Sequence, residues 1–203
     1  MNGTKRKGRK GPFMVDVLGA VNDFVLKYAF ANPDLPALTQ PQIIRGWQNY
    51  GGLPPKTQEL VILTLLSAAR RGTNVRTRRD ADAPSGIVET VSRLAEHLVQ
   101  IDFCCARPRM PEYAARTRAE IVEVLTRDPV GVSFFQKYGL SSCYADEVRA
   151  LPFVNESRQW VARYSVTIHL TGWSGVEIPV DSFADVQLRI ENVDEHHPVK
   201  KGV

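Results

Sequence analysis

The chain has no hydrophobic run that approaches the roughly 20 residues needed to span a bilayer. Its start, Met1 to Lys10, is basic, but the apolar residues that follow are interrupted by Asp16, Asn22 and Asp23. This interruption argues against a secretory signal peptide. We therefore expect a soluble protein that makes no membrane contact and stays in the compartment where it is made.

Cysteine is scarce: the three residues are Cys104, Cys105 and Cys143. An odd count with an adjacent pair fits neither a disulfide framework nor a zinc site, whose ligands usually come in spaced pairs. On a strand, Cys104 and Cys105 would point to opposite faces and could not easily share a metal. The pattern predicts reduced, structural thiols.

Histidine is also scarce, and motifs of catalysis are missing. His97 and His169 fall in separate predicted strands with no carboxylate pattern nearby, and His196-His197 fall in a polar tail. The serines and cysteines lack a nucleophile elbow or a recognisable base. We therefore predict no metal, no cofactor and no enzymatic activity.

Two further patterns could be mistaken for chemistry. Arg71-Gly72-Thr73 lacks both the glycine spacing and the Lys-Ser/Thr of a phosphate loop. Glu120 and Glu123 lie one helical turn apart among other charges, which is typical of a solvated helix face.

The length of 203 residues, with 43% hydrophobic and 24% charged residues, is typical of one soluble domain with a proper core. Apolar spacing predicts a helix from Phe13 to about Tyr28, which ends by Asn32-Pro33. A second helix is predicted from Pro111 to Asp128-Pro129, with Ala114, Thr117, Ile121 and Leu125 on its inward face. The aromatic residues from Phe134 to Tyr138 predict a short helix or turn.

Alternating or continuous apolar patterns predict the strands. Leu60–Leu66 reads as a strand covered on both faces, and Gly172–Gly175 as a break between two strands. Residues 70–84 are either a flexible loop or the tip of a long hairpin that returns through Ile87–Ala95. The other predicted strands are Ile43–Trp47, Val99–Cys105, Trp160–Leu170 and Ala184–Glu191.

These elements predict a two-layer α/β (α+β) fold. A mostly antiparallel sheet of four to six strands would carry two main helices on one face and a long hairpin or loop extension. Residues 1–12 are predicted to be a disordered basic arm, 13–195 a single domain, and 196–203 a flexible tail. Strands this long cannot all be paired within the chain, so we expect a neighbour or an arm to cover an edge.

Two basic runs stand out from a net charge of +4. They are Lys5, Arg6, Lys7, Arg9 and Lys10 in the arm, and Arg70, Arg71, Arg76, Arg78 and Arg79 in the middle of the chain. Either run can contact nucleic acid or an acidic partner, or can simply be solvated. No aromatic residue lies between Arg70 and Pro84, so a base-stacking platform is missing there.

The aromatic residues favour core positions over a ligand pocket. This interpretation covers Trp47, Trp160, Phe134, Phe135, Tyr138 and Tyr144. Trp173 differs because it lies in a glycine-flanked segment, and it is a candidate exposed interface anchor.

The order of short motifs resembles the tail (neck) terminator proteins of tailed bacteriophages over roughly residues 13 to 195. The motifs are Gln42-Ile43-Ile44-Arg45-Gly46-Trp47-Gln48-Asn49, Arg70-Arg71-Gly72-Thr73-Asn74, Val99-Gln100-Ile101-Asp102-Phe103, Leu125-Thr126-Arg127-Asp128-Pro129, Phe134-Phe135, Gly139-Leu140, Ala145-Asp146, Arg149-Ala150-Leu151-Pro152, Glu156 and Arg163-Tyr164-Ser165-Val166-Thr167.

The resemblance implies a small structural subunit of the virion tail or neck, assembled in the host cytoplasm. Such subunits close into a ring, usually a hexamer, that caps the head-proximal end of the tail tube and stops its polymerisation. The implied partners are other copies of the chain, the tail tube protein and a head-completion or connector protein, with DNA passing through the lumen. Other readings remain: another head–tail joining or tail-completion protein, or a nonspecific nucleic-acid-binding module.

Overall fold

The computed structural model describes residues 14–31, 42–46, 60–80, 86–105, 113–154, 158 and 160–181. The predicted basic arm 1–12, the predicted tail 196–203, the strand predicted at Ala184–Glu191 and Trp47 lie outside the described residues.

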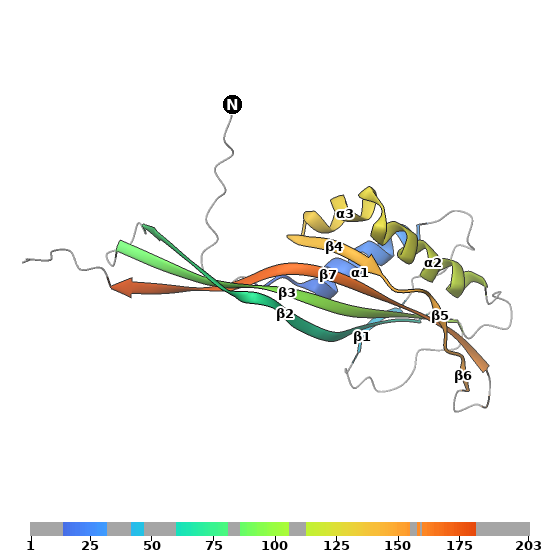
Figure 1. The fold of residues 1–203 in the computed structure, drawn as a ribbon. Helices are drawn as coiled ribbons and strands as arrows, with labels where there is room; N and C mark the ends of the chain where they lie inside the picture. Colours follow the sequence, from blue (N-terminus) through green and yellow to red (C-terminus); the bar gives the residue numbers. More distant parts are fainter. Residues whose placement is uncertain are drawn as a thin grey trace, which may run out of the picture.

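One sheet organises the described residues (Figure 1). Its main order is β1 (Gln42–Arg45), β2 (Leu60–Asp80), β3 (Gly86–Cys105), β7 (Trp160–Asp181) and β4 (Leu140–Ala145). The short strands β5 (Arg149–Ala150) and β6 (Phe153–Val154) also pair with β7. Only β1 and β2 run parallel among the described pairs. The predicted α+β fold with a mostly antiparallel sheet is confirmed.

The number of strands, four to six, was predicted too low, since seven are described. The additional ones include β5 and β6, which have two residues each. Two residues are too few for an alternating apolar pattern to be recognised. They border β7 one after the other beyond β4, so together these three strands cover the outer edge of β7 from Trp160 to Gly172 discontinuously.

Three strands of 20 to 22 residues form a long ribbon, β2-β3-β7. The hairpin interpretation of residues 70–84 is therefore correct as far as residue 80, and the loop interpretation is wrong, because β2 pairs with β3 up to Asp80–Ile87. In Figure 1 the ribbon continues well past the helices as three bare strands. The outer part of this ribbon, residues 70–80, 86–96 and 171–181, is called the distal ribbon below.

The break predicted at Gly172–Gly175 is wrong, because β7 continues through it. Gly172 pairs with Ala95 on one side and Leu140 on the other. A Cβ at Gly172 would lie 2.8 Å from a methyl carbon of Leu140. The glycine therefore allows close packing of β4 on β7 rather than a turn, and strand pairing on both sides outweighs its low strand propensity.

The helices cover one face of the other half of the sheet (Figure 1). They are α1 (Val17–Phe24), the π-helix η1 (Val25–Ala29), α2 (Tyr113–Arg127) and α3 (Pro129–Gln136). Asp16 caps α1 by accepting a 2.9 Å hydrogen bond from the Gly19 amide. Asp128 caps α3 in the same manner, at 2.8 Å from the Val130 amide, with Pro129 in its first turn. The first two predicted helices and the short aromatic helix are confirmed.

The predicted inward face of α2 is partly wrong. Ala115, Ala119 and Val122 are buried against the main core, whereas Thr117, Ile121 and Leu125 are only partly buried. Small alanines let the helix axis approach the sheet closely, which turns the larger apolar side chains sideways. Ala114 is buried as predicted.

Aromatic side chains lock the helices together. Phe24 contacts both Phe134 and Phe135, at ring-centroid distances of 5.3 and 4.7 Å. The Tyr138 hydroxyl donates a 2.7 Å hydrogen bond to Asp23 beside this cluster. The core positions predicted for Phe134 and Phe135 are therefore confirmed.

Among the described residues, the opposite face of the sheet carries a small apolar cluster of Leu60, Cys104 and Val161, with Ile44, Ile62 and Phe153 packed against it. Cys104 and Cys105 belong to different clusters, which confirms that they point to opposite faces. The strand at 60–66 is covered on both faces only at its start, because Leu65 and Leu66 are exposed. Trp160, predicted to be a core residue, is 72% exposed where β7 begins.

Candidate interaction surface

The five arginines of the middle basic run all lie on β2 and are exposed. Four of them are tied to carboxylates of this chain. Arg76 lies 3.1 Å and Arg78 3.6 Å from the Glu89 carboxylate, and Arg71 pairs with Glu96. Arg79 reaches across β3 to Glu177 on β7, at 3.1 Å. The arginines are therefore partly neutralised within the ribbon.

The carboxylates that receive these arginines are buried on the central strand. Glu89 and Glu96 are 7% and 6% exposed, because β3 has a strand on each side. Arg71 holds the pKa of Glu96 below its usual value, with a smaller contribution from His169. A third acid of β3 repeats the pattern, since Asp102 is 2% exposed and pairs with Arg163 of β7 at 2.8 Å.

Counting the whole distal ribbon gives six arginines and five acids, so its formal net charge is only +1. The arginines are Arg70, Arg71, Arg76, Arg78, Arg79 and Arg93, and the acids are Asp80, Glu89, Glu96, Glu177 and Asp181. A protrusion so close to neutral produces little long-range attraction for nucleic acid. The charge balance favours a protein-contacting role over DNA binding for this segment.

A kink shapes β2 inside the basic run. Pairing with β3 is irregular between Arg71 and Val75, and Gly72 has a φ of +80°. Arg70 bridges the kink by donating to the Gly72 carbonyl at 3.0 Å and to the Asn74 side chain at 2.8 Å. Gly72 thus has a conformational role, because the left-handed region is costly for other residues.

His169 lies among carboxylates, contrary to the prediction. Its Nδ1 is 3.2 Å from Glu96 and its Nε2 is 3.4 Å from Asp146, and the Tyr144 ring stacks on it at 4.0 Å. Tyr144, also predicted to be core, is 41% exposed. This cluster joins β3, β7 and the end of β4. Sequence periodicity could not find it because β3 and β7 meet only through long-range register.

His97 is on the other face of β3 from Glu96 by strand alternation. Burial, and secondarily the charge of Arg93, lowers its pKa. In the part of the chain that the structure describes, no group of three or more His, Cys, Asp or Glu side chains is arranged to hold a metal ion.

The distal part of β7 has exposed apolar side chains on both faces, because strand alternation places Trp173 on the opposite face from Val176 and Ile178. Trp173, Val176 and Ile178 are 45%, 51% and 46% exposed. The predicted exposure of Trp173 is therefore seen, although it lies in a strand rather than a turn. Val75 on β2 is exposed as well, at 42%.

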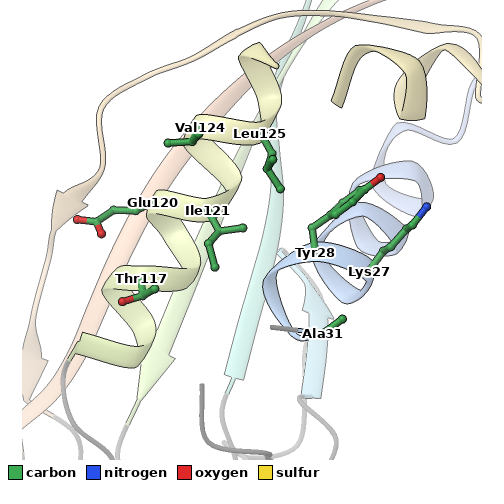
Figure 2. Close-up of a pocket in the computed structure, with 8 residues that line it drawn as sticks. All are labelled: Lys27, Tyr28, Ala31, Thr117, Glu120, Ile121, Val124 and Leu125. Carbon is green, nitrogen blue, oxygen red and sulfur yellow. The ribbon is translucent and has the colours of Figure 1, made fainter. Parts of the chain in front are cut away.

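A groove of about 560 Å³ lies between η1 and α2 (Figure 2). Ile121 and Leu125 point from α2 toward Tyr28, and Lys27 and Glu120 stand at its borders. This is where the larger apolar residues of α2 are placed.

Among the described helices, none is both long enough and apolar enough to cross a membrane. The arm residues Lys5, Arg6, Lys7, Arg9 and Lys10 lie outside the described residues.

Sheet, helical layer and charge-balanced ribbon together define a structural α+β subunit with a projecting strand surface. The model of the phage neck terminator protein family matches residues 16–195, and the chain belongs to this family of structural tail and neck proteins. A search of curated proteins finds no match.

Proposed function

We propose that this chain is the subunit of a ring at the head-proximal end of the phage tail. The ring is a hexamer, as the resemblance to the family implies. The ring ends polymerisation of the tail tube and offers the surface to which the filled head joins. Its partners are other copies of the chain, the tail tube protein and a head-completion or connector protein. It is assembled in the host cytoplasm and retained in the virion.

The observation that carries this proposal is the distal ribbon of a chain that belongs to the neck terminator family. The ribbon projects past the helices, has a formal charge near zero, and exposes Trp173, Val176 and Ile178. Such a protrusion buries little of its own surface, and exposed apolar side chains on a strand are typical of a contact surface.

The test uses phage from which this chain has been removed, with the wild-type chain supplied in trans as the control. Electron microscopy should show tails of uncontrolled length that fail to join heads, and the supplied chain should restore normal particles. Tails of normal length that lack heads would instead favour another joining or completion protein. Normal particles without the chain would contradict a role in the neck.

A further inference from the structure

Among the described strands, both outer edges of the distal ribbon are open. On one side, β1 pairs with β2 only as far as Leu63. On the other side, β4 pairs with β7 only as far as Gly172. From the row Arg71–Leu94–Trp173 outward, no described strand pairs with the outer edge of either β2 or β7.

An open edge presents unpaired backbone N–H and C=O groups, which another strand can satisfy. About half of the backbone groups of an edge strand point outward in this manner. The open stretch runs from 64 to 80 on β2 and from 173 to 181 on β7. The two stretches overlap in level along the distal ribbon, between 71–80 on β2 and 173–181 on β7.

The directions of the strands select how two copies can meet. Since β2 and β7 are both antiparallel to β3, they run in the same direction. When copies related by rotation stand side by side, β7 of one copy therefore lies next to β2 of the next copy, and the two strands run parallel. Within one chain, β1 already pairs with β2 in the same parallel manner. This contact is heterologous, which is the type that closes into rings.

Charge and apolar surface agree with this pairing. By sequence, residues 71–80 of β2 carry four arginines and Asp80, a net charge of +3, while residues 173–181 of β7 carry Glu177 and Asp181, a net charge of −2. The internal Arg79–Glu177 pair offsets part of both charges, but the two edges keep opposite signs, whereas β7 against β7 would bring like charges together. Val176 and Ile178 add exposed apolar side chains on one face of β7, and Val75 of β2 is exposed on the other face.

From this geometry we infer that the distal edge of β7 binds the distal edge of β2 in a second copy of the chain, so that the sheets of neighbouring subunits become continuous. This inference rests on the proposed ring function and names its subunit contact.

The first test introduces one cysteine on each edge of the same chain, I178C together with R76C or R78C, because the register places Arg76 and Arg78 on the same face of the sheet as Ile178. Within one subunit these positions are two strands apart, about 9–10 Å, which exceeds the roughly 7 Å limit for a disulfide. Mild oxidation of assembled particles should give a ladder of cross-linked multimers for at least one pair. Each single-cysteine variant is a control and should give no cross-linked dimer.

The second test places lysine on the edge, as V176K with I178K, because charges on an edge strand oppose pairing. The fold should persist, since both side chains are already about half exposed, and thermal unfolding checks this. The variant should fail to complement the deleted phage. The control V124K, at a 66% exposed position on α2, should complement normally.

The outcomes separate the two proposals. The edge contact is wrong if the chain is present in isolated necks, no cysteine pair gives a ladder, and the lysine variant complements fully. The ring function is not affected by that outcome. A disulfide-linked dimer of the single I178C variant would also overturn the edge contact, because β7 would then meet β7. Normal particles from phage lacking the chain would overturn the ring function itself.

Discussion

At the scale of single residues, the buried acids of β3 determine how the ribbon holds its arginines. Glu96 receives Arg71 from β2 and His169 from β7, so it connects all three long strands. Removing a buried charge with such partners leaves them incompletely satisfied, which typically costs about 1–3 kcal/mol. Exposed pairs contribute far less, because water solvates both ions in either state.

We therefore expect E96Q to lower the free energy of unfolding at pH 7 by about 1–3 kcal/mol. The matched control is E120Q, which removes the exposed Arg116–Glu120 pair of α2 and should cost at most about 0.5 kcal/mol. Urea denaturation followed by circular dichroism measures both. Equal effects of the two substitutions would contradict the role given to Glu96.

The same residue predicts a pH dependence. The folded protein has a lowered pKa at Glu96, so the unfolded chain binds more protons as pH falls below the ordinary value of 4.5. Stability present above that pH is then lost as pH falls through the folded pKa. His97, whose pKa is lowered from 6.5 by burial, adds a loss of the same sign that begins nearer pH 6.5.

Urea midpoints measured from pH 8 to pH 3 should therefore decline in both windows for the wild type. In the E96Q variant the decline below about pH 4.5 should be absent, whereas the decline near pH 6.5 should remain. The urea midpoints of the two proteins should therefore converge at the acid end. A constant difference down to pH 3 would show that Glu96 is not the group that titrates.

Burial also sets the reactivity of Cys104. Loss of solvation, with the nearby Asp102 charge, raises the pKa of its thiol to about 12. The thiolate is the reactive form, so iodoacetamide at pH 8 should leave Cys104 unmodified in the folded protein and modify it in urea. Peptide mass spectrometry distinguishes these results, and rapid labelling of the folded protein would contradict the burial.

At the scale of elements, the kink of β2 depends on the left-handed conformation of Gly72. Alanine has open space there, since nothing lies within 4 Å of the added Cβ, but it must adopt the same positive φ. We expect G72A to reduce stability by about 1–2 kcal/mol through backbone conformation alone. The neighbouring exposed substitution T73A should change the thermal midpoint little. A stable G72A protein would mean that the kink relaxes at no cost.

The cap of α3 gives a second test at this scale. Asp128 ends α2, begins α3 and accepts the Val130 amide, so D128A should cost about 1 kcal/mol. D128S, which can accept the same hydrogen bond, should recover most of that loss. Thermal unfolding of the three proteins compares them directly, and equal midpoints for D128A and D128S would remove the cap from the explanation.

These elements also show what the sequence can predict. Helices and strands with clear apolar periods, such as Trp160–Leu170, are predicted because the period records which face is buried. The continuation of β7 through Gly172 was missed, because it depends on Leu140 of β4, which is distant in sequence. The inward face of α2 differs from the prediction because Ala115, Ala119 and Val122 are buried in the core, whereas Ile121 and Leu125 are only partly buried.

The candidate surface was only partly predictable for the same reason. The arginines of β2 and the exposed Trp173 could be named from the sequence, but the carboxylates that pair with the arginines could not. Glu89 and Glu96 meet those arginines only through the register of β2 on β3. Local patterns do not contain that register, so a charge-balanced ribbon looks like a basic loop when it is read along the chain.

At the scale of the whole molecule, the distribution of charge indicates which part of the chain can contact DNA and which part is suited to protein contacts. The five basic residues of the arm account for more than the entire net charge of +4, so the chain from residue 13 onward has a formal charge of −1. The distal ribbon, at +1, contributes little long-range field. Any nonspecific affinity for duplex DNA should therefore come from residues 1–12.

We expect deletion of residues 1–12 to remove most duplex binding by the purified chain at low salt, together with its salt dependence, because each phosphate contact contributes to the salt slope. The triple variant R76A/R78A/R79A should retain most of the binding and should instead lose stability, since Glu89 would remain buried without its partners. Fluorescence anisotropy across a salt series, with thermal unfolding of the same samples, measures both effects. If the triple variant lost DNA binding while the deletion kept it, the ribbon rather than the arm would be the surface that DNA meets, and its arginines would act through their exposed sides despite their internal partners.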